Sequence, residues 1–381
     1  MRSVLVTGGA GFIGSHVVDA LVRRGDDVVV VDNLDPAAHA SQPRYLNPGA
    51  RYVWADLRHR STWADVVPGI DVVCHQAGKV GLGVDFGDCD AYVEHNDQAW
   101  AVGLRSLHDA RFAGTIVLAS SMVVYGEGRY RCPTHGLVAP SPRLAADLDA
   151  GRFEPGCPAC AAPLAAEAVP ENAPIDPRNV YAATKVHQEH LLAAFCREHD
   201  VDATVLRYHN VYGERMPRDT PYAGVAAIFR SALERGAGPL VNEDGRQMRN
   251  FVDVADVAAA NVAAIDRAGG LRAFNVASGE PHSVGEMAEA LAAAFDLRPG
   301  SLAWPEVTGR YRLGDVRHVF ASTTRAANEL GCRAVVPFAE GMRRFARAEL
   351  RDPVTPTTSA SMASGSTNGA SAKRATTRGV A

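Results

Sequence analysis

Short apolar runs alternate with helical patterns along the first two hundred residues of the chain. The runs fall at 4–6, 28–31, 51–54, 72–75, 115–119 and 203–207. The first helical pattern has its apolar stripe at Ile13, Val17, Val18, Leu21 and Val22, and it stops at Gly25. Further helical patterns lie at about 92–110 and from Asn179 onward. Strands that alternate with helices in this way predict a doubly wound parallel sheet, which is an α/β fold.

The pattern changes at three points further along the chain. Residues 129–178 contain nine of the 22 prolines and show little periodicity, so we interpret them as an insertion outside the sheet. From 210 to 350 the elements are shorter and mixed, which predicts a smaller α+β substrate lobe after a sheet domain at 1–209. Residues 353–381 are mainly Ser, Thr, Ala and Gly, the composition of a disordered tail.

Three glycines follow the first strand and open the first helix. Gly8, Gly11 and Gly14 form a G-x-x-G-x-x-G pattern, a variant of the dinucleotide fingerprint of Rossmann-like folds. Such a turn brings backbone close to a pyrophosphate, and the helix N-terminus offers free N–H groups and partial positive charge. The second strand ends in Asp32, where a carboxylate would hold the ribose diol of NAD and repel the extra phosphate of NADP. We therefore expect NAD as the cofactor.

Other expected cofactor contacts lie mainly near the ends of strands. Residues 56–57 lie where such folds contact the adenine, and the loop at 76–81 lies where the middle of the cofactor is expected. The full set beyond the glycines and Asp32 is Phe12, Ile13, Asn33, Asp56, Leu57, Gln76, Ala77, Lys79, Asn96, Ser120, Tyr181, Lys185 and Tyr208.

Composition and charge limit the class of protein. The chain is 47% hydrophobic and 22% charged, which is typical of a globular enzyme. A net charge of −4 gives no basic footprint and argues against nucleic acid as a partner. No apolar run is long enough to span a membrane and no leader precedes the first strand, so we expect a cytoplasmic protein. The odd number of cysteines, seven, makes a disulfide framework improbable.

A tyrosine and a lysine four residues apart form the candidate catalytic pair. Tyr181 and Lys185 have a spacing that places both on one face of a helix. A phenol with its ordinary pKa of about 10 is a poor base at neutral pH, but a nearby ammonium and an oxidised nicotinamide would lower that pKa. We also expect Lys185 to bond the nicotinamide ribose, and Ser121 to align the substrate hydroxyl with Tyr181.

The insertion carries a second kind of chemistry. Cys132 and His135 form one C-x-x-[C/H] knuckle, and Cys157 and Cys160 form another 21 residues later. Two ligands on each of two tight turns assemble tetrahedral Cys₃His zinc sites in ribbon-like modules. A segment with so few apolar residues would gain its folding free energy from such a metal. We therefore predict a structural, zinc-ribbon-like module, with a flexible lid carrying incidental cysteines as the alternative.

The order of these motifs resembles a known family. The stretches 7–14, 120–126 and 181–185 are similar to those of the extended short-chain dehydrogenases, the nucleotide-sugar epimerase/dehydratase family. Three stretches in or next to the smaller lobe resemble the segments that bind the sugar nucleotide, at 206–213, 244–252 and 312–315. The resemblance implies an NAD enzyme that acts as a homodimer on a nucleotide sugar. It implies these substrate contacts: Ser121, Asn210, Val225, Arg249, Arg312 and Asp315.

Departures from the family pattern limit which reaction of the family the chain can catalyse. Met122 and Val123 stand where 4,6-dehydratases of the family carry Asp and Glu, and where decarboxylating relatives carry a Glu. Neither side chain can transfer a proton, so the resemblance implies oxidation at a carbinol carbon and return of the hydride, which is epimerisation. Asn250 and Asp253 replace the more usual Asp and His, and Asn96 lacks the usual Gly-Thr sequel. These changes affect the fine geometry of the site and not the class of reaction.

Several functions stay open at this point. The stretches 126–133 and 221–229 and the Cys-Pro-x-Cys knuckle resemble a 4-epimerase branch that acts on dTDP-6-deoxyhexoses. A UDP-hexose 4-epimerase and a net nucleotide-sugar oxidoreductase are alternatives among enzymes. A third alternative is an NAD-sensing regulator that contacts a partner through the zinc module. The complete set of Ser121, Tyr181 and Lys185 argues against a protein without catalysis.

Overall fold

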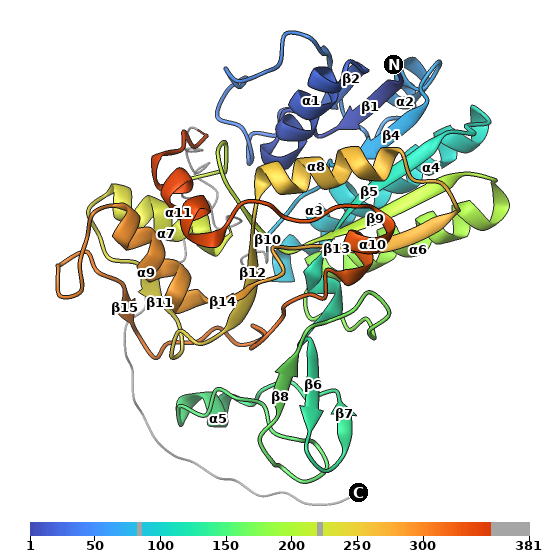
Figure 1. The fold of residues 1–381 in the computed structure, drawn as a ribbon. Coiled ribbons are helices and arrows are strands. Elements are labelled where there is room, and N and C mark those ends of the chain that lie inside the picture. Colours follow the sequence, from blue (N-terminus) through green and yellow to red (C-terminus); the bar gives the residue numbers. More distant parts are fainter. Residues whose placement is uncertain (82–85, 219–223, 352–381) are drawn as a thin grey trace, which may run out of the picture.

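A seven-stranded sheet forms the centre of the molecule (Figure 1). The computed structural model describes residues 1–81, 86–218 and 224–351, so the predicted tail at 353–381 lies outside the described residues. The strands are β1 (Ser3–Thr7), β2 (Asp27–Asp32), β3 (Arg51–Trp54), β4 (Val72–His75), β5 (Thr115–Ser121), β9 (Asp202–Tyr208) and β13 (Leu271–Val276). Their order is β13-β9-β5-β4-β1-β2-β3, and every neighbouring pair is parallel. The predicted doubly wound sheet is confirmed.

Helices cover both faces of this sheet because its strands are apolar on both sides. On β1, Val4 and Val6 pack into one core with α1 (Phe12–Arg24) and α8 (Val254–Ile265). Leu5 packs into the opposite core. The helices on that second face are α2 (Arg60–Val66), α4 (Ala99–Asp109) and α6 (Val180–Glu198). The parallel strands therefore end at one common edge, where ligands bind in such folds.

The helix predicted at about 92–110 is irregular at its start. A 3₁₀ turn (Phe86–Asp88) leads into α3 (Cys89–Tyr92), and a π-helical turn (Val93–Gln98) joins α3 to α4. Such wide turns occur often at functional sites. Asn96 lies in this turn, and its side chain is buried.

The smaller lobe lies beyond the carboxyl edge of the sheet (Figure 1). It contains a three-stranded sheet, a two-stranded ribbon and three helices that share a separate core. Its elements are β10 (Asn210–Tyr212), α7 (Val225–Glu234), β11 (Leu240–Val241), β12 (Met248–Asp253), β14 (Pro281–Ser283), α9 (Val284–Ala294), β15 (Glu306–Val307) and α11 (Phe338–Arg347).

A division of the chain at residue 210 is too simple. The chain enters the smaller lobe at β10, but α8 and β13 return to the main sheet, and α10 (Thr324–Glu329) packs on β13. β13 pairs in parallel with β9, and a parallel pair requires a crossover, which includes α8 here. The two units are therefore interleaved along the sequence, and residues 254–276 belong to the sheet domain.

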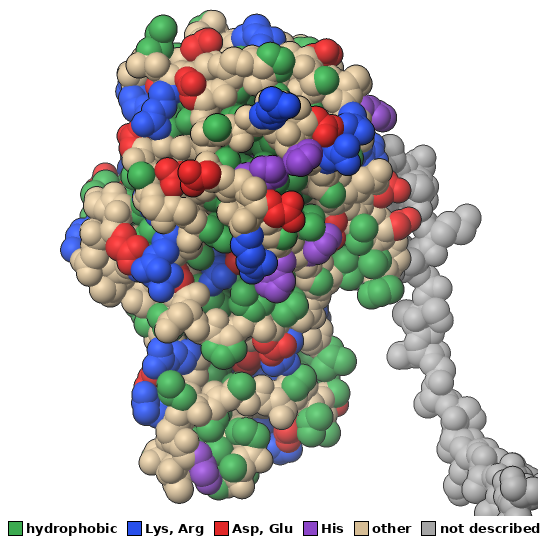
Figure 2. Space-filling model, turned by 90° about the vertical axis from the view of Figure 1, so that its right-hand side faces the viewer, with side chains coloured by type: hydrophobic (Ala, Val, Ile, Leu, Met, Phe, Trp, Pro, Cys, Tyr) green, Lys and Arg blue, Asp and Glu red, His purple; other side chains and the backbone are tan. Residues whose placement is uncertain are grey.

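The insertion forms a lobe of its own below the body (Figures 1 and 2). Its strands β6 (Arg129–Cys132), β7 (Gly136–Val138) and β8 (Ala165–Glu167) make an antiparallel sheet in the order β7-β6-β8, beside the short α5 (Ala145–Asp149). The prediction that it lies outside the main sheet is confirmed. Figure 2 shows basic and acidic side chains interspersed on the viewed face. No helix among the described residues has both the length and the apolar character needed to cross a membrane.

Candidate active site

A cleft of about 290 Å³ opens at the carboxyl edge of the sheet, over the start of α1. Two glycines of its floor leave no room for a side chain. A Cβ atom on Gly14 would lie 2.2 Å from the Gly8 carbonyl oxygen. Gly8 has φ +67°, and a Cβ there would lie 2.7 Å from the Ala77 Cα. The turn therefore brings bare backbone and a helix N-terminus to the cleft, which fits a dinucleotide pyrophosphate.

The structure brings nearly all the predicted cofactor residues together. Those that line the cleft are Gly8, Gly11, Phe12, Ile13, Gly14, Asp32, Asn33, Asp56, Leu57, Gln76, Ala77, Lys79, Ser120, Tyr181, Lys185 and Tyr208. Asn96 does not line it. Its buried side chain accepts from the Lys79 amide at 2.7 Å and donates to the Lys79 carbonyl at 3.0 Å and to Thr184 Oγ1 at 2.9 Å. Asn96 therefore ties the loop after β4 to the helix that carries Lys185.

Asp32 stands at the adenosine end, where the dinucleotide ribose is expected. Its carboxylate accepts from the amides of Ala10 at 3.0 Å and Leu34 at 2.9 Å, which holds it in place at the end of β2. His39 Nε2 lies 3.9 Å from this carboxylate, and Arg351 also lines the cleft. Sequence reasoning missed both, because neither follows a strand or belongs to a motif. Only the fold brings positions 39 and 351 to position 32.

Tyr181 and Lys185 project from the first turns of α6. The helix begins where Asn179 Oδ1 accepts from the Ala182 amide at 2.8 Å, a typical N-cap. Lys185 Nζ donates to the Ala119 carbonyl and to Gln188 Oε1, each at 3.0 Å. Burial lowers the pKa of Lys185 to about 8, although Asp97 and Glu189 act in the opposite direction. The ammonium is thus held at a defined point, 6.0 Å from the centre of the Tyr181 ring.

The pKa of the Tyr181 hydroxyl differs from the expectation, which was a lowered value. Burial raises its pKa to about 12, and only its hydrogen bond with Ser121 acts to lower it. Lys185 directs two of its donors to Ala119 and Gln188, and its ammonium lies 6.0 Å from the centre of the Tyr181 ring. The lowering that we predicted therefore depends on the positive charge of a bound, oxidised nicotinamide.

The two serines at the end of β5 have different surroundings. Ser120 Oγ donates to Glu189 Oε1 at 2.5 Å, and Glu189 is paired with the buried Arg207 at 2.7 Å. Ser120 is therefore part of a buried network under the cleft. Ser121 is hydrogen bonded with Tyr181 and accepts from the Val123 amide at 3.4 Å. Of the two serines, only Ser121 contacts the candidate base.

Apart from Ser121 at the end of β5, the residues predicted to bind substrate lie in or beside the smaller lobe, and none of the six lines the cleft. Asn210 stands on β10, and its buried Oδ1 has no hydrogen-bond partner among the described residues. Arg249 on β12 donates to the carbonyls of Met248 and Arg317 at 2.8 Å and of Val316 at 2.7 Å. Val225 begins α7, whereas Arg312 is exposed and Asp315 half-buried on the loop before Val316.

The turn directly after β5 carries no carboxylic acid. Met122 and Val123 open a 3₁₀ turn, and both are half-buried. Glu127 follows further along, but its carboxylate accepts from the Tyr130 hydroxyl at 3.1 Å and from the Arg317 amide at 2.5 Å. Glu127 is thus occupied in holding two segments together.

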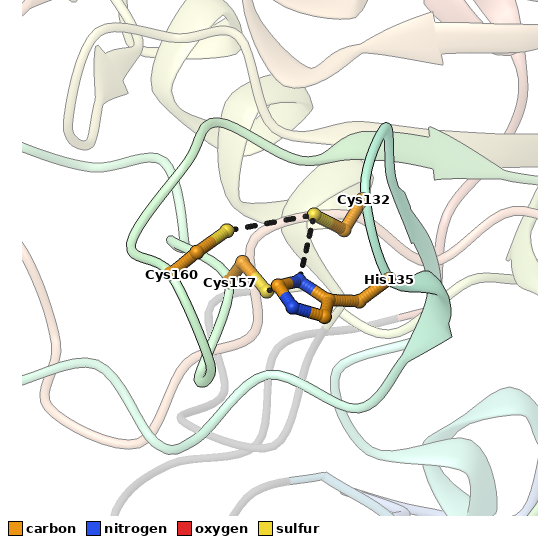
Figure 3. Close-up of side chains that lie close together, drawn as sticks. All are labelled: Cys132, His135, Cys157 and Cys160. Atoms are coloured by element: carbon orange, nitrogen blue, oxygen red, sulfur yellow. Dashed lines mark hydrogen bonds between the residues drawn. The ribbon is translucent and has the colours of Figure 1, made fainter.

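The four predicted metal ligands converge at the free end of the insertion (Figure 3). Cys132 and His135 come from the β6–β7 hairpin, and Cys157 and Cys160 from the loop before β8. The ligand atoms all lie within 4.8 Å of one another. Cys132 Sγ lies 3.7 Å from Cys160 Sγ, and the sulfur atoms of Cys132 and Cys157 each lie 3.5 Å from His135 Nδ1.

Comparisons with known proteins agree with this arrangement. The chain is 34% identical to the dTDP-L-rhamnose 4-epimerase of Burkholderia thailandensis over 87% of this chain and 90% of that protein. The solved structure of Thermotoga maritima UDP-glucose 4-epimerase with UDP-glucose is similar, with a TM-score of 0.73 and 27% identity over 90% of this chain and 97% of that one. The Thermus thermophilus UDP-glucose 4-epimerase complex with NAD has a TM-score of 0.70 and 29% identity over the same shares.

A family model matches most of the chain directly. The description of that model is "NAD dependent epimerase/dehydratase family", and it covers residues 4–143 and 157–277. The unmatched gap between them falls within the insertion. The matched residues include the glycine turn, the Tyr181–Lys185 pair and Arg249. The chain belongs to the NAD-dependent epimerase/dehydratase family.

Proposed function

We propose that this enzyme is a nucleotide-sugar 4-epimerase that acts on a dTDP-activated 6-deoxyhexose. The observation that carries the proposal is the set of Ser121, Tyr181 and Lys185 beside the dinucleotide cleft, followed by a turn without an acid. The set supports transfer of one proton and one hydride at a carbinol carbon, and the missing acid disfavours loss of water. The dTDP sugar is supported by the relative at 34% identity and by the resemblances at 126–133 and 221–229.

The side chains have separate tasks in this reaction. Bound NAD supplies the acceptor and donor of the C4 hydride. Tyr181, as its phenolate, takes the proton from the C4 hydroxyl as the hydride leaves C4, and the resulting phenol returns the proton when the hydride comes back, while Ser121 keeps the substrate hydroxyl aligned. Two of the three Lys185 donors are bonded to Ala119 and Gln188, so one is left for the cofactor ribose. The diphosphate is held by Asn210, Arg249 and Arg312 while the 4-keto sugar rotates within the pocket. Val225 and Asp315 contribute to the substrate pocket.

A panel of nucleotide sugars tests the proposal. The purified protein is incubated with dTDP- and UDP-hexoses without added NAD, and proton NMR reports the configuration at C4. Epimerisation of a dTDP-6-deoxyhexose supports the assignment, whereas turnover confined to UDP-hexoses favours the UDP-hexose 4-epimerase that the Thermotoga and Thermus neighbours represent. A strict need for added NAD with a net change in oxidation state indicates an oxidoreductase. No turnover of any sugar by a protein that retains NAD indicates a regulator.

We also propose that Cys132, His135, Cys157 and Cys160 hold a structural zinc ion. A tetrahedral zinc with Zn–S of about 2.3 Å and Zn–N of about 2.0 Å places two sulfurs about 3.8 Å apart and a sulfur and a nitrogen about 3.5 Å apart. The observed 3.7 Å and 3.5 Å separations match these edges. All four coordination positions would then be filled by protein, which supports a structural role over a catalytic one.

Elemental analysis of protein purified without added metal tests the zinc proposal. We expect about one zinc per chain, and Cys157→Ser should lower both the zinc content and the melting temperature. Cys89→Ser is the matched control, because Cys89 lies on α3, outside the cluster. Less than about a third of an equivalent of zinc, with Cys157→Ser leaving the melting temperature unchanged, would end the proposal.

A further inference from the structure

The insertion is joined to the smaller lobe by a group of ion pairs and hydrogen bonds whose residues do not line the NAD cleft. Glu154 lies three residues before Cys157, on the loop that leads to the cysteine cluster. Glu154 Oε1 accepts from Arg317 at 2.9 and 2.6 Å, and Oε2 accepts from His318 Nε2 at 2.9 Å. Arg143, also in the insertion, pairs with Glu243 at 2.8 Å. Three pairs of side chains thus join the insertion to the lobe across this junction.

Arg317 stands at the centre of this junction. Its side chain is 0% exposed, and its guanidinium contacts Glu243 at 2.8 Å and Asp244 at 2.7 Å in addition to Glu154. Three carboxylates from two separate segments therefore surround one buried cation. A buried guanidinium is stable only when carboxylates pair with it, and removal of any one of these partners changes where the guanidinium is held. The position of Arg317 thus depends on the insertion as well as on the lobe.

Two routes lead from Glu154 to Arg249. His318 donates to Glu154 through Nε2, and its Nδ1 accepts from the Met248 amide at 3.0 Å, directly before Arg249. By the second route, the carbonyl of Arg317 accepts from the Arg249 guanidinium at 2.8 Å. The backbone positions that hold the Arg249 side chain are therefore set by residues that Glu154 holds.

We infer that the insertion is a positioning element of the substrate site, and that Glu154 acts through Arg317 and His318 to place the Arg249 guanidinium for the substrate diphosphate. This inference rests on the proposed function, in which Arg249 holds that diphosphate. No residue of the junction lines the NAD cleft. Loss of Glu154 therefore weakens binding of a nucleoside diphosphate and leaves NAD binding unchanged.

Calorimetric titration of the NAD-containing protein with dTDP and with UDP tests this inference. Glu154→Gln keeps the shape of the side chain and removes its charge, while Arg317 retains Glu243 and Asp244. We expect about tenfold weaker binding of the diphosphate, within the range of about 2- to 30-fold that mutations along coupled networks cause. With substrate, KM rises by a similar factor and kcat changes less. The NAD content of the purified variant stays at the native level.

Asp147→Asn is the matched control. Asp147 lies on α5 in the same insertion with its side chain 43% exposed, and its carboxylate contacts Arg152 within the insertion. It should leave dTDP affinity unchanged. If Glu154→Gln does not yield folded protein, Glu154→Asp, which keeps the charge and shortens the side chain, is titrated in its place, and unchanged diphosphate affinity in that variant overturns the inference.

The outcomes separate this inference from the function on which it rests. Native protein that binds dTDP or UDP, with Glu154→Gln binding it equally well, overturns the positioning role and leaves the proposed function standing. Equal weakening by Asp147→Asn, or loss of NAD from Glu154→Gln, also overturns it, because the effect is then not specific to the diphosphate site. Native protein that binds neither diphosphate overturns the proposed function, and this inference with it.

Discussion

Substitution of Gly14 tests whether the glycine turn is the cofactor cradle. In Gly14→Ala the new Cβ would lie 2.2 Å from the Gly8 carbonyl oxygen and 2.9 Å from the Gly8 carbonyl carbon. These are backbone atoms, so no side chain can rotate away. The turn must open by at least about 0.8 Å to reach 3.0 Å, and overpacking of this kind typically costs about 1–3 kcal/mol.

The strain should appear in dinucleotide binding, because the atoms that move form the floor of the cleft. If it falls wholly on the bound state, 1–3 kcal/mol corresponds to roughly 5- to 140-fold weaker binding of NAD. The assay is the NAD content of the purified protein, by absorbance after release, together with calorimetric titration of stripped protein. The melting temperature is recorded for each sample.

Gly25→Ala provides the matched control at the other end of the same helix. Gly25 has φ +90°, and a Cβ there would meet no atom within 4 Å. Its cost of about 1–2 kcal/mol is therefore backbone strain alone, remote from the cleft. We expect Gly25→Ala to lose stability and keep NAD. Native NAD content in Gly14→Ala, or equal loss of NAD from both variants, would refute the interpretation that the glycine turn holds the cofactor.

Three further predictions concern the cleft. Tyr181→Phe should lower kcat by about 10²–10⁴-fold while NAD stays bound, and more than about a tenth of native activity would contradict its role as base. Asp32→Ala combined with Asn33→Arg should improve NADP affinity at least about tenfold, because it removes the repulsion between Asp32 and the extra phosphate. A native protein that binds NADP as tightly as NAD in a titration would contradict this role of Asp32. The pKa of Lys185 is lowered to about 8, so the folded state binds fewer protons than the unfolded state between pH 8 and about 10.5, and Lys185 lowers stability below pH 8. Relative to Lys185→Met, the free energy of unfolding should therefore rise across this window by at most about 3 kcal/mol, and parallel pH profiles would show that Lys185 is not buried as described.

Local patterns predicted the parts of the protein that depend on neighbours along the chain. The strand, glycine turn and helix up to Gly25 follow from residues a few positions apart, as does the presence of Tyr181 and Lys185 on one helix face. Backbone conformation, capping and helical periodicity act over such short separations. For the same reason the two cysteine knuckles could be recognised as pairs before their convergence was known.

Contacts between distant segments could be decided only by the tertiary structure. The return of β13 to the main sheet, the approach of His39 to Asp32, and the junction of Glu154 with Arg317 join positions with no shared local pattern. The pKa of Tyr181 belongs to the same class. The Tyr-x-x-x-Lys spacing correctly places an ammonium nearby, but burial by the surrounding elements raises that pKa. Spacing determines which groups a helix can present, whereas burial and partners from elsewhere in the chain determine their charge.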